Sequence, residues 1–246
     1  MFFLSLNTLT NCSLNPPGNC WLNASGNYYL NASGYCDLGE HYITNPPKCQ
    51  APQDTEISGT FLTSGLKFDN IDICFFSTGT WDPKKEKDID VEQMEDVFKV
   101  NFFGTVNSIK AVEQYFRDKK NGIITIVSSI AGYRGLPNST GYGPSKSALN
   151  NLAESLYFDF KRYNVRVCLV SPGFIKTPMT DKNDFKMPFL KTPEYAADQI
   201  YEGLVNKNIF EIHFPKSLTI TLKLLSFLPS KIYFGLVGKL TKYQKK

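Results

Sequence analysis

Three side chains close together in the sequence, Ser129, Tyr142 and Lys146, could together move a proton. Tyr142 and Lys146 are four residues apart, so on a helix both side chains lie on one face. A free phenol titrates at about pH 10, and a neighbouring ammonium favours the phenolate and lowers its pKa. A strand-end hydroxyl that faces this pair completes a proton-transfer arrangement. These residue types at this spacing indicate acid–base chemistry.

The sequence around this set predicts a strand, a loop and a helix. An Asn-Gly turn pair precedes the β-branched run 123–127, which predicts a buried strand ending at two serines. A loop rich in Gly, Pro, Asn and Ser follows, and the apolar spacing predicts a helix over 141–163. Ligands of open α/β sheets bind where strands end, so a hydroxyl at this strand end faces a suitable place.

Strands and helices alternate through the rest of the chain after residue 60. Apolar runs predict strands over 68–76, 165–171 and 210–214, and an apolar stripe predicts a long helix over 90–118. Thr192-Pro193-Glu194 is a helix start signal. This alternation is typical of an α/β fold with a parallel sheet.

These residues resemble the short-chain dehydrogenase/reductase family over about residues 66–246. In that family a Ser stands 13 residues before the Tyr of a Tyr-x-x-x-Lys motif, as Ser129 and Tyr142 do here. Residues 172–177 match the family's P-G-x-x-x-T sequence after the following strand. The resemblance implies an α/β domain with a Rossmann-like, doubly wound parallel sheet, incomplete here at its N-terminal side.

The resemblance also implies an activity: an NAD(P)-dependent oxidoreductase that interconverts a small-molecule alcohol and a carbonyl by hydride transfer. Tyr142 would be the acid/base, and Lys146 would lower its pKa and bond the nicotinamide ribose. Ser129 would donate a hydrogen bond to the carbonyl oxygen. Asn101, in the context Val100-Asn101-Phe102, would hold a water that relays protons.

Further residues would contact the cofactor by the same resemblance. Gly79 ends the strand that lies beside the adenosine in the family, although only the glycine of the family's Asn-Asn-Ala-Gly is kept. Pro172 and Gly173 would shape a loop against the nicotinamide, and Thr177 would contact its carboxamide. Helices 90–118 and 141–163 build a dimer interface in the family, which implies a homo-oligomer.

Residues 1–60 depart from this pattern. From Leu6 onward an Asn-rich eight-residue repeat places Leu at positions 6, 14, 22 and 30, and no helical or strand period sustains an apolar face. We therefore expect an irregular segment over 1–60, followed by the dehydrogenase-like domain over 61–246. No G-x-x-x-G-x-G turn occurs in residues 1–70, so the pyrophosphate-binding turn and the choice between NAD and NADP cannot be read.

Two hypotheses about function follow from this departure. The first is an NAD(P)-dependent oxidoreductase of unidentified substrate. The second is a catalytically inactive remnant that acts as an interaction or dimerisation module.

Composition excludes other classes of function. The formal charge of +4 comes without an arginine-rich stripe, which argues against nucleic-acid binding. Six Cys form no C-x-x-C pair and the two His are far apart in sequence, so no metal site is predicted. Cys74 and Cys168 lie in apolar runs and are expected to be buried thiols. The apolar opening MFFLSLNTL has no basic n-region, so a cytoplasmic protein is expected.

The C-terminal residues 217–240 are rich in Leu, Ile and Phe and are punctuated by lysines. Pro229 and the lysines argue against a spanning helix. Two interpretations remain. The segment either lies as a basic amphipathic tail on a membrane surface, or it caps the core or packs in a dimer.

Overall fold

The computed structural model describes most of the chain after residue 70 and three short strands before it. The described residues are 3–6, 19–22, 28–31, 71–82, 88–183 and 187–241. The chain divides into two compact units, each built from three segments. The first comprises 1–78, 103–126 and 155–167, and the second comprises 79–102, 127–154 and 168–246.

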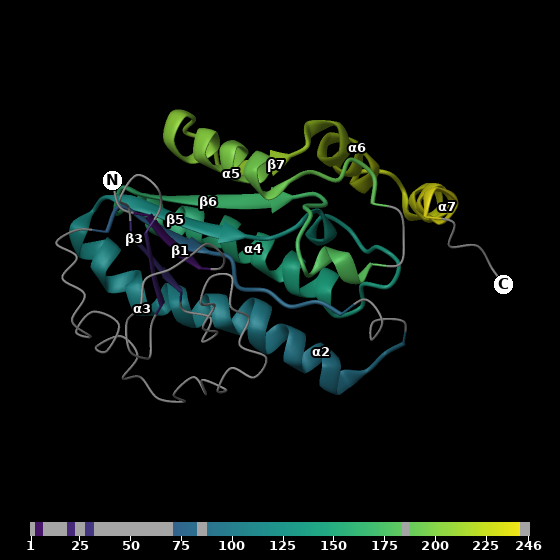
Figure 1. The fold of residues 1–246 in the computed structure, drawn as a ribbon, viewed down its shortest axis with the longest axis horizontal. Coiled ribbons are helices and arrows are strands. Elements are labelled where there is room, and N and C mark those ends of the chain that lie inside the picture. Colours follow the sequence, from purple (N-terminus) through teal and green to yellow (C-terminus); the bar gives the residue numbers. More distant parts are fainter. Residues whose placement is uncertain are drawn as a thin grey trace. The chain divides into compact units, whose positions relative to one another are not determined.

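A five-stranded sheet has the strand order β1-β4-β5-β6-β7 (Figure 1). These strands are Phe3–Leu6, Ile73–Phe76, Gly122–Val127, Val165–Pro172 and Glu211–Phe214. Pairing is parallel between β1 and β4, between β4 and β5, and between β6 and β7. Helices flank the sheet, so the predicted α/β fold with a parallel sheet is confirmed. The apolar runs that predicted β4, β5 and β6 are largely buried, which is typical of parallel strands covered on both faces.

In the first unit, the end of helix α3 (Gly104–Lys119) is fixed to the start of β4. Lys119 Nζ lies 2.9 Å from a carboxylate oxygen of Asp72 and donates to the Ile71 carbonyl. Phe116 is fully buried and lies against Gly122, which has a φ of +131°. A Cβ at Gly122 would lie 2.4 Å from the Phe116 ring, so both the backbone conformation and the space require glycine there.

The predicted helix 90–118 consists of three segments in the structure. α2 (Val91–Phe98) begins at Asp90, whose side chain accepts a hydrogen bond from the backbone N–H of Gln93. A π-helical turn, Lys99–Phe103, follows and leads into α3. The sequence predicted one regular helix, because a π turn inserts one residue without changing the apolar composition around it.

The second unit contains β7 and the helices around it. α5 (Pro193–Tyr201) begins as predicted at Thr192, whose hydroxyl accepts a hydrogen bond from the Tyr195 N–H, and a π-helical turn (Glu202–Asn206) ends it. After β7, the residues 217–240 form two helices, α6 (Lys216–Ser226) and α7 (Ser230–Leu240), separated at Pro229. No helix in the described part of the chain is long and apolar enough to cross a membrane.

Three short strands lie within the Asn-rich segment that we expected to be irregular. β1 extends the sheet beside β4, and β2 (Asn19–Leu22) pairs antiparallel with β3 (Tyr28–Asn31). Each strand has four residues, too few for a period of two to be recognised in the sequence. The other residues of 1–60, and the predicted boundary between residues 60 and 61, lie outside the described residues.

Candidate active site

The two serines at the end of β5 have different hydrogen bonds. Ser128 is buried, and its hydroxyl donates to the carbonyl oxygen of Lys146 at 3.0 Å. Ser129 caps a short 3-10 turn, η2 (Ile130–Gly132), and its hydroxyl oxygen accepts from the Ala131 N–H at 3.2 Å. Because Ser129 Oγ accepts this bond, its hydroxyl proton remains for another acceptor. The Ser128 hydroxyl proton is already donated to the Lys146 carbonyl. Ser129 is therefore the serine that can donate to a substrate oxygen.

Glycines allow the turn after Ser129 to pack directly on helix α4 (Tyr142–Lys161). A Cβ on Gly132 would lie 2.9 Å from the backbone carbonyl of Lys146, and a Cβ on Gly143 would lie 3.4 Å from the Ala131 carbonyl oxygen. The segment that carries Ser129 and the first turn of the helix that carries Tyr142 are thus in backbone contact. No larger residue fits at Gly132 without moving one of them.

Lys146 is a buried cation beside the Tyr142 ring. Its side chain is 3% exposed, its Nζ donates to the Val127 carbonyl at 3.1 Å, and the same Nζ lies 5.7 Å from the centroid of the Tyr142 ring. Burial lowers the pKa of Lys146 from 10.5 to about 8, because the charged form loses its hydration. The ammonium is still mostly protonated at neutral pH, so it can act as the cation beside the phenol.

The lowered pKa predicts a pH-dependent stability that Lys146→Met removes. The folded pKa lies below the unfolded one, so burying the charge costs stability below pH 8 and costs nothing above about 10.5. Between these values, the free energy of unfolding of the parent should rise relative to that of the variant, by up to about 1.4 kcal/mol per pH unit. Urea denaturation from pH 7 to 10.5 measures this slope. Lys110→Met, at a lysine whose side chain is 79% exposed, is the control and should leave the slope unchanged.

Asn101 joins the loop after β4 to the Tyr-x-x-x-Lys segment. It lies in the π-helical turn and is fully buried. Its Oδ1 accepts from the Thr80 N–H at 2.7 Å, and its Nδ2 donates to the Thr80 carbonyl at 3.1 Å and to the Ser145 hydroxyl at 3.0 Å. π turns in helices are frequent at functional sites, and this one places a buried amide between two site segments.

Gly79 lies at the closest approach between the loop after β4 and the site lysine. A Cβ on Gly79 would lie 3.3 Å from Lys146 Nζ and 3.8 Å from Asn101 Oδ1. The family resemblance predicts a ligand against this glycine, and the structure places the Lys146 ammonium there. Gly79, Asn101, Tyr142 and Lys146 are therefore brought together in the second unit.

Trp81 is a site residue that the sequence argument missed. Its ring stacks on the Tyr142 ring with centroids 5.2 Å apart and an interplanar angle of 28°. Asn101 holds the backbone of Thr80 on both its N–H and its carbonyl, which fixes the residue directly before Trp81. The only signal in the sequence was a large aromatic two residues after Gly79.

The residues after β6 make their own local contacts. Pro172 pairs with Phe214 in the sheet, and the Gly173 N–H donates to the Phe214 carbonyl at 2.7 Å. The Thr177 hydroxyl lies 3.3 Å from the Thr180 hydroxyl. Among the described hydrogen bonds and ring contacts, none joins these three residues to Tyr142 or Lys146, so their predicted role at the nicotinamide stays a prediction.

The site fits the ribose end of a nicotinamide cofactor. An ammonium has three donors, and the Val127 carbonyl is the one hydrogen-bond partner of Lys146 Nζ among the described residues. Neighbouring ribose hydroxyls could accept the remaining hydrogens. For the pyrophosphate of such a cofactor, the sequence provides fewer candidate binding residues. β1 supplies a strand, yet in the sequence the first glycine after it is Gly18, so no glycine-rich sequence directly follows β1.

Comparison with known proteins identifies the class. Residues 48–187 match the family model described as short chain dehydrogenase, and because this is more than half of the chain, the chain belongs to that family. The match begins before residue 66, where the motifs alone had placed its start. A solved short chain dehydrogenase from Burkholderia cenocepacia, in complex with NADP, has a TM-score of 0.62 at 19% identity and covers 74% of this chain and 76% of its own. At this identity, the likeness supports the fold alone.

Two curated relatives show how the similarity is distributed. An uncharacterized oxidoreductase of Myxococcus xanthus is 30% identical over 163 residues, which is 66% of this chain and 64% of the relative. A 3-ketodihydrosphingosine reductase of Bacteroides thetaiotaomicron is 35% identical over 105 residues, 43% of this chain and 39% of the relative. The chain therefore spans between about two fifths and two thirds of the lengths of these relatives.

Proposed function

We propose that this chain is an NAD(P)-dependent oxidoreductase that interconverts an alcohol and a carbonyl. The observation that carries the proposal is the buried Lys146 ammonium beside the Tyr142 ring, enclosed by Gly79 and by the loop that Asn101 holds. Burying a lysine ammonium costs stability, and groups with perturbed pKa values cluster at functional sites, so a buried ammonium next to a phenol supports a catalytic role.

Each residue of the candidate site would have a separate role in the reaction. Tyr142 transfers a proton to or from the substrate oxygen, and the Lys146 ammonium favours its phenolate form. The Ser129 hydroxyl donates a hydrogen bond to the same oxygen and stabilises the charge that develops there. Asn101 holds the loop before Trp81 and the Ser145 hydroxyl, and it would keep the proton path in place. A bound nicotinamide would supply or accept the hydride.

Residues of the candidate site and of the loop after β6 would bind NADP or NAD. Lys146 would bind the ribose hydroxyls. Gly79 would leave room for the cofactor at the loop after β4. Pro172, Gly173 and Thr177 would lie against the nicotinamide. A solved protein of the same fold is in complex with NADP, so we choose NADP as the first cofactor to test.

The names of several relatives point to a first substrate. Proteins of Bacteroides thetaiotaomicron and Bos taurus named 3-ketodihydrosphingosine reductase are 35% and 34% identical to parts of this chain. We therefore expect a ketone on a long aliphatic chain to be reduced. The test follows NADPH absorbance with 3-ketodihydrosphingosine and with short ketones. Turnover of any ketone supports the oxidoreductase, and turnover of short ketones alone would contradict the lipid substrate.

The second candidate is an inactive remnant that serves as an interaction or dimerisation module. It is supported by the missing glycine-rich turn and by exposed aromatic side chains, Phe103 and Phe158, in the predicted dimer helices. NADPH and NADH binding discriminates the two functions. The remnant binds neither cofactor.

We propose three further properties of the chain. It forms a homo-oligomer through helices 90–118 and 141–163, which light scattering would test. It is cytoplasmic. Residues 217–240 make a peripheral contact with a membrane, since their lysines and exposed apolar side chains occur together.

A further inference from the structure

Helices α6 and α7 carry apolar side chains on two sides. On the inner side Leu218, Tyr233 and Val237 are buried, so the helices do cap the core. On the outer side apolar residues recur at helical spacing and are solvent-exposed. We call them the outer stripe: Ile220 and Leu224 on α6, Phe227 directly after it, and Ile232, Leu236 and Leu240 on α7. Phe227 is 85% exposed, which is unusual for a large aromatic side chain with no role at the surface.

The charged residues in the sequence of the C-terminal segment have one sign. Residues 216–246 contain seven lysines and no acidic residue. The rest of the chain contains 20 basic and 23 acidic residues, which gives it a net charge of −3. The positive charge of the protein therefore resides in the segment that carries the exposed apolar side chains.

Arg134 fastens the junction of the two helices. Its guanidinium donates to the carbonyls of Ser226 at 3.0 Å and Leu228 at 2.7 Å, and to the Ser230 hydroxyl at 3.0 Å. It also lies 4.0 Å from the centroid of the Tyr233 ring, whose hydroxyl donates to the Gly135 carbonyl. A cation at the last carbonyls of α6 is favourable there. The helices are thus part of the folded unit.

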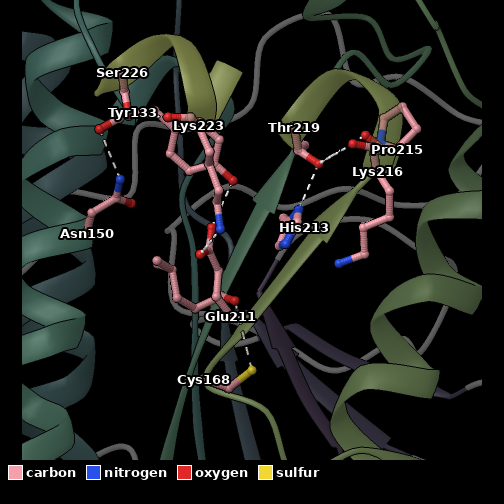
Figure 2. A network of polar contacts seen from close by, with 12 residues as sticks. Tyr133, Asn150, Cys168, Glu211, His213, Pro215, Lys216, Thr219, Lys223 and Ser226 are labelled. Atoms are coloured by element: carbon pink, nitrogen blue, oxygen red, sulfur yellow. Dashed lines mark hydrogen bonds and ion pairs between the residues drawn. The ribbon is translucent and has the colours of Figure 1, made fainter. Parts of the chain in front are cut away.

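A second set of polar contacts holds α6 to β7 (Figure 2). Lys223 forms an ion pair with Glu211, and the Tyr133 hydroxyl donates to the same carboxylate at 2.8 Å. Burial and the neighbouring Glu211 raise the pKa of Tyr133, which keeps it a neutral donor. A cavity of about 220 Å³ lies beside this ion pair, lined also by Phe210 and Phe227, and it contains none of the site residues above.

We propose that the outer stripe of α6 and α7 docks on an anionic membrane surface, with both helices lying in the plane of the headgroups. The inference deepens the peripheral contact proposed for residues 217–240, and it does not depend on oxidoreductase activity. Exposed apolar side chains would enter the headgroup boundary, and lysines such as Lys231 and Lys239 would pair with anionic lipids. A second copy of the chain would bring an equal set of lysines against the first, so anionic lipid is the better partner.

Docking there would have a consequence for the active site. Arg134 and Tyr133 lie in the loop directly after η2, and η2 follows Ser129. The surface that meets the membrane is therefore fastened to the segment that presents the candidate catalytic hydroxyl. A lipid-borne carbonyl would be reduced at the membrane surface.

Vesicle flotation tests the docking directly. The full chain should float with phosphatidylcholine vesicles that contain phosphatidylserine, and it should float poorly with phosphatidylcholine alone or at high salt. Leu224→Glu/Phe227→Glu changes two exposed positions and should abolish flotation. Ile89→Glu/Val91→Glu adds the same charges at exposed positions outside the two helices and should float like the parent. Lys231→Gln/Lys239→Gln should weaken binding by about tenfold or more.

Other results would overturn the proposal. One is flotation of Leu224→Glu/Phe227→Glu at the level of the parent, with circular dichroism confirming that both are folded. Another is a parent that binds no anionic vesicle. If the parent fails to float and the same variant halves its mass in light scattering, the outer stripe joins two copies of the chain instead. Loss of activity with intact flotation would count against the proposed function and leave the docking in place.

Discussion

Replacing Tyr142 by Phe is expected to lower kcat by about 10²- to 10⁴-fold, the usual loss when a positioned acid/base is removed. The substitution deletes only the hydroxyl, so the ring stack with Trp81 and the neighbourhood of Lys146 should remain. NADPH affinity should change little, because the proton donor acts mainly in the transition state. NADPH oxidation with the best ketone, together with an NADPH titration, measures both quantities.

Tyr157→Phe provides the matched control for this substitution. Tyr157 lies on the same helix, α4, and is 36% exposed. The control should keep the kcat of the parent. Equal activity of Tyr142→Phe and the parent would remove Tyr142 from the chemistry, whatever the motif implies.

Replacing Asn101 by Leu is expected to reduce both stability and activity. Leucine has a similar volume, yet it removes three hydrogen bonds and leaves the Thr80 backbone groups and the buried Ser145 hydroxyl without this partner. Each lost bond costs about 0.5–1.5 kcal/mol and unsatisfied buried groups cost more, so the free energy of unfolding should fall by about 2–4 kcal/mol. The loop that carries Trp81 would lose its anchor, and kcat should fall by tenfold or more even where the variant is folded.

Urea denaturation and NADPH oxidation measure the two effects of Asn101→Leu. Asn107→Leu makes the same chemical change at an exposed position on α3 and should leave both nearly unchanged. If Asn101→Leu loses stability but keeps the kcat of the parent, Asn101 is a structural residue with no part in positioning the site.

Local chemistry in the sequence predicted many of the elements. β-branched runs placed β5 and β6, and Thr192-Pro193 placed the start of α5. These features depend on residues within one or two turns of each other, so composition and spacing reveal them. The four-residue spacing of Tyr142 and Lys146 is another feature that depends only on residues close in the sequence.

Features that depend on distant partners could not be predicted in this way. The π-helical turn in which Asn101 is buried cannot be recognised from the spacing of apolar residues along the helix. The stack of Trp81 on Tyr142 joins residues 61 positions apart in the numbering, and the contacts of Arg134 with Ser226 and Leu228 join residues more than 90 apart. Only folding brings such groups together. β1 was missed because a run of four residues does not reveal which strand it will pair with.

Cofactor binding tests the central claim, that Lys146, Tyr142 and the loop at Gly79 form a nicotinamide site. The chain has two tryptophans, so Trp21→Phe leaves Trp81, stacked on Tyr142, as the single fluorescent donor. Titration with NADPH and with NADH should give saturable quenching of Trp81 and energy transfer to the nicotinamide for at least one of them. Lys146→Met should weaken the affinity for the cofactor, and Lys110→Met should leave that affinity unchanged. A folded protein that shows no saturable binding of either cofactor would contradict the account and leave the interaction module as the function.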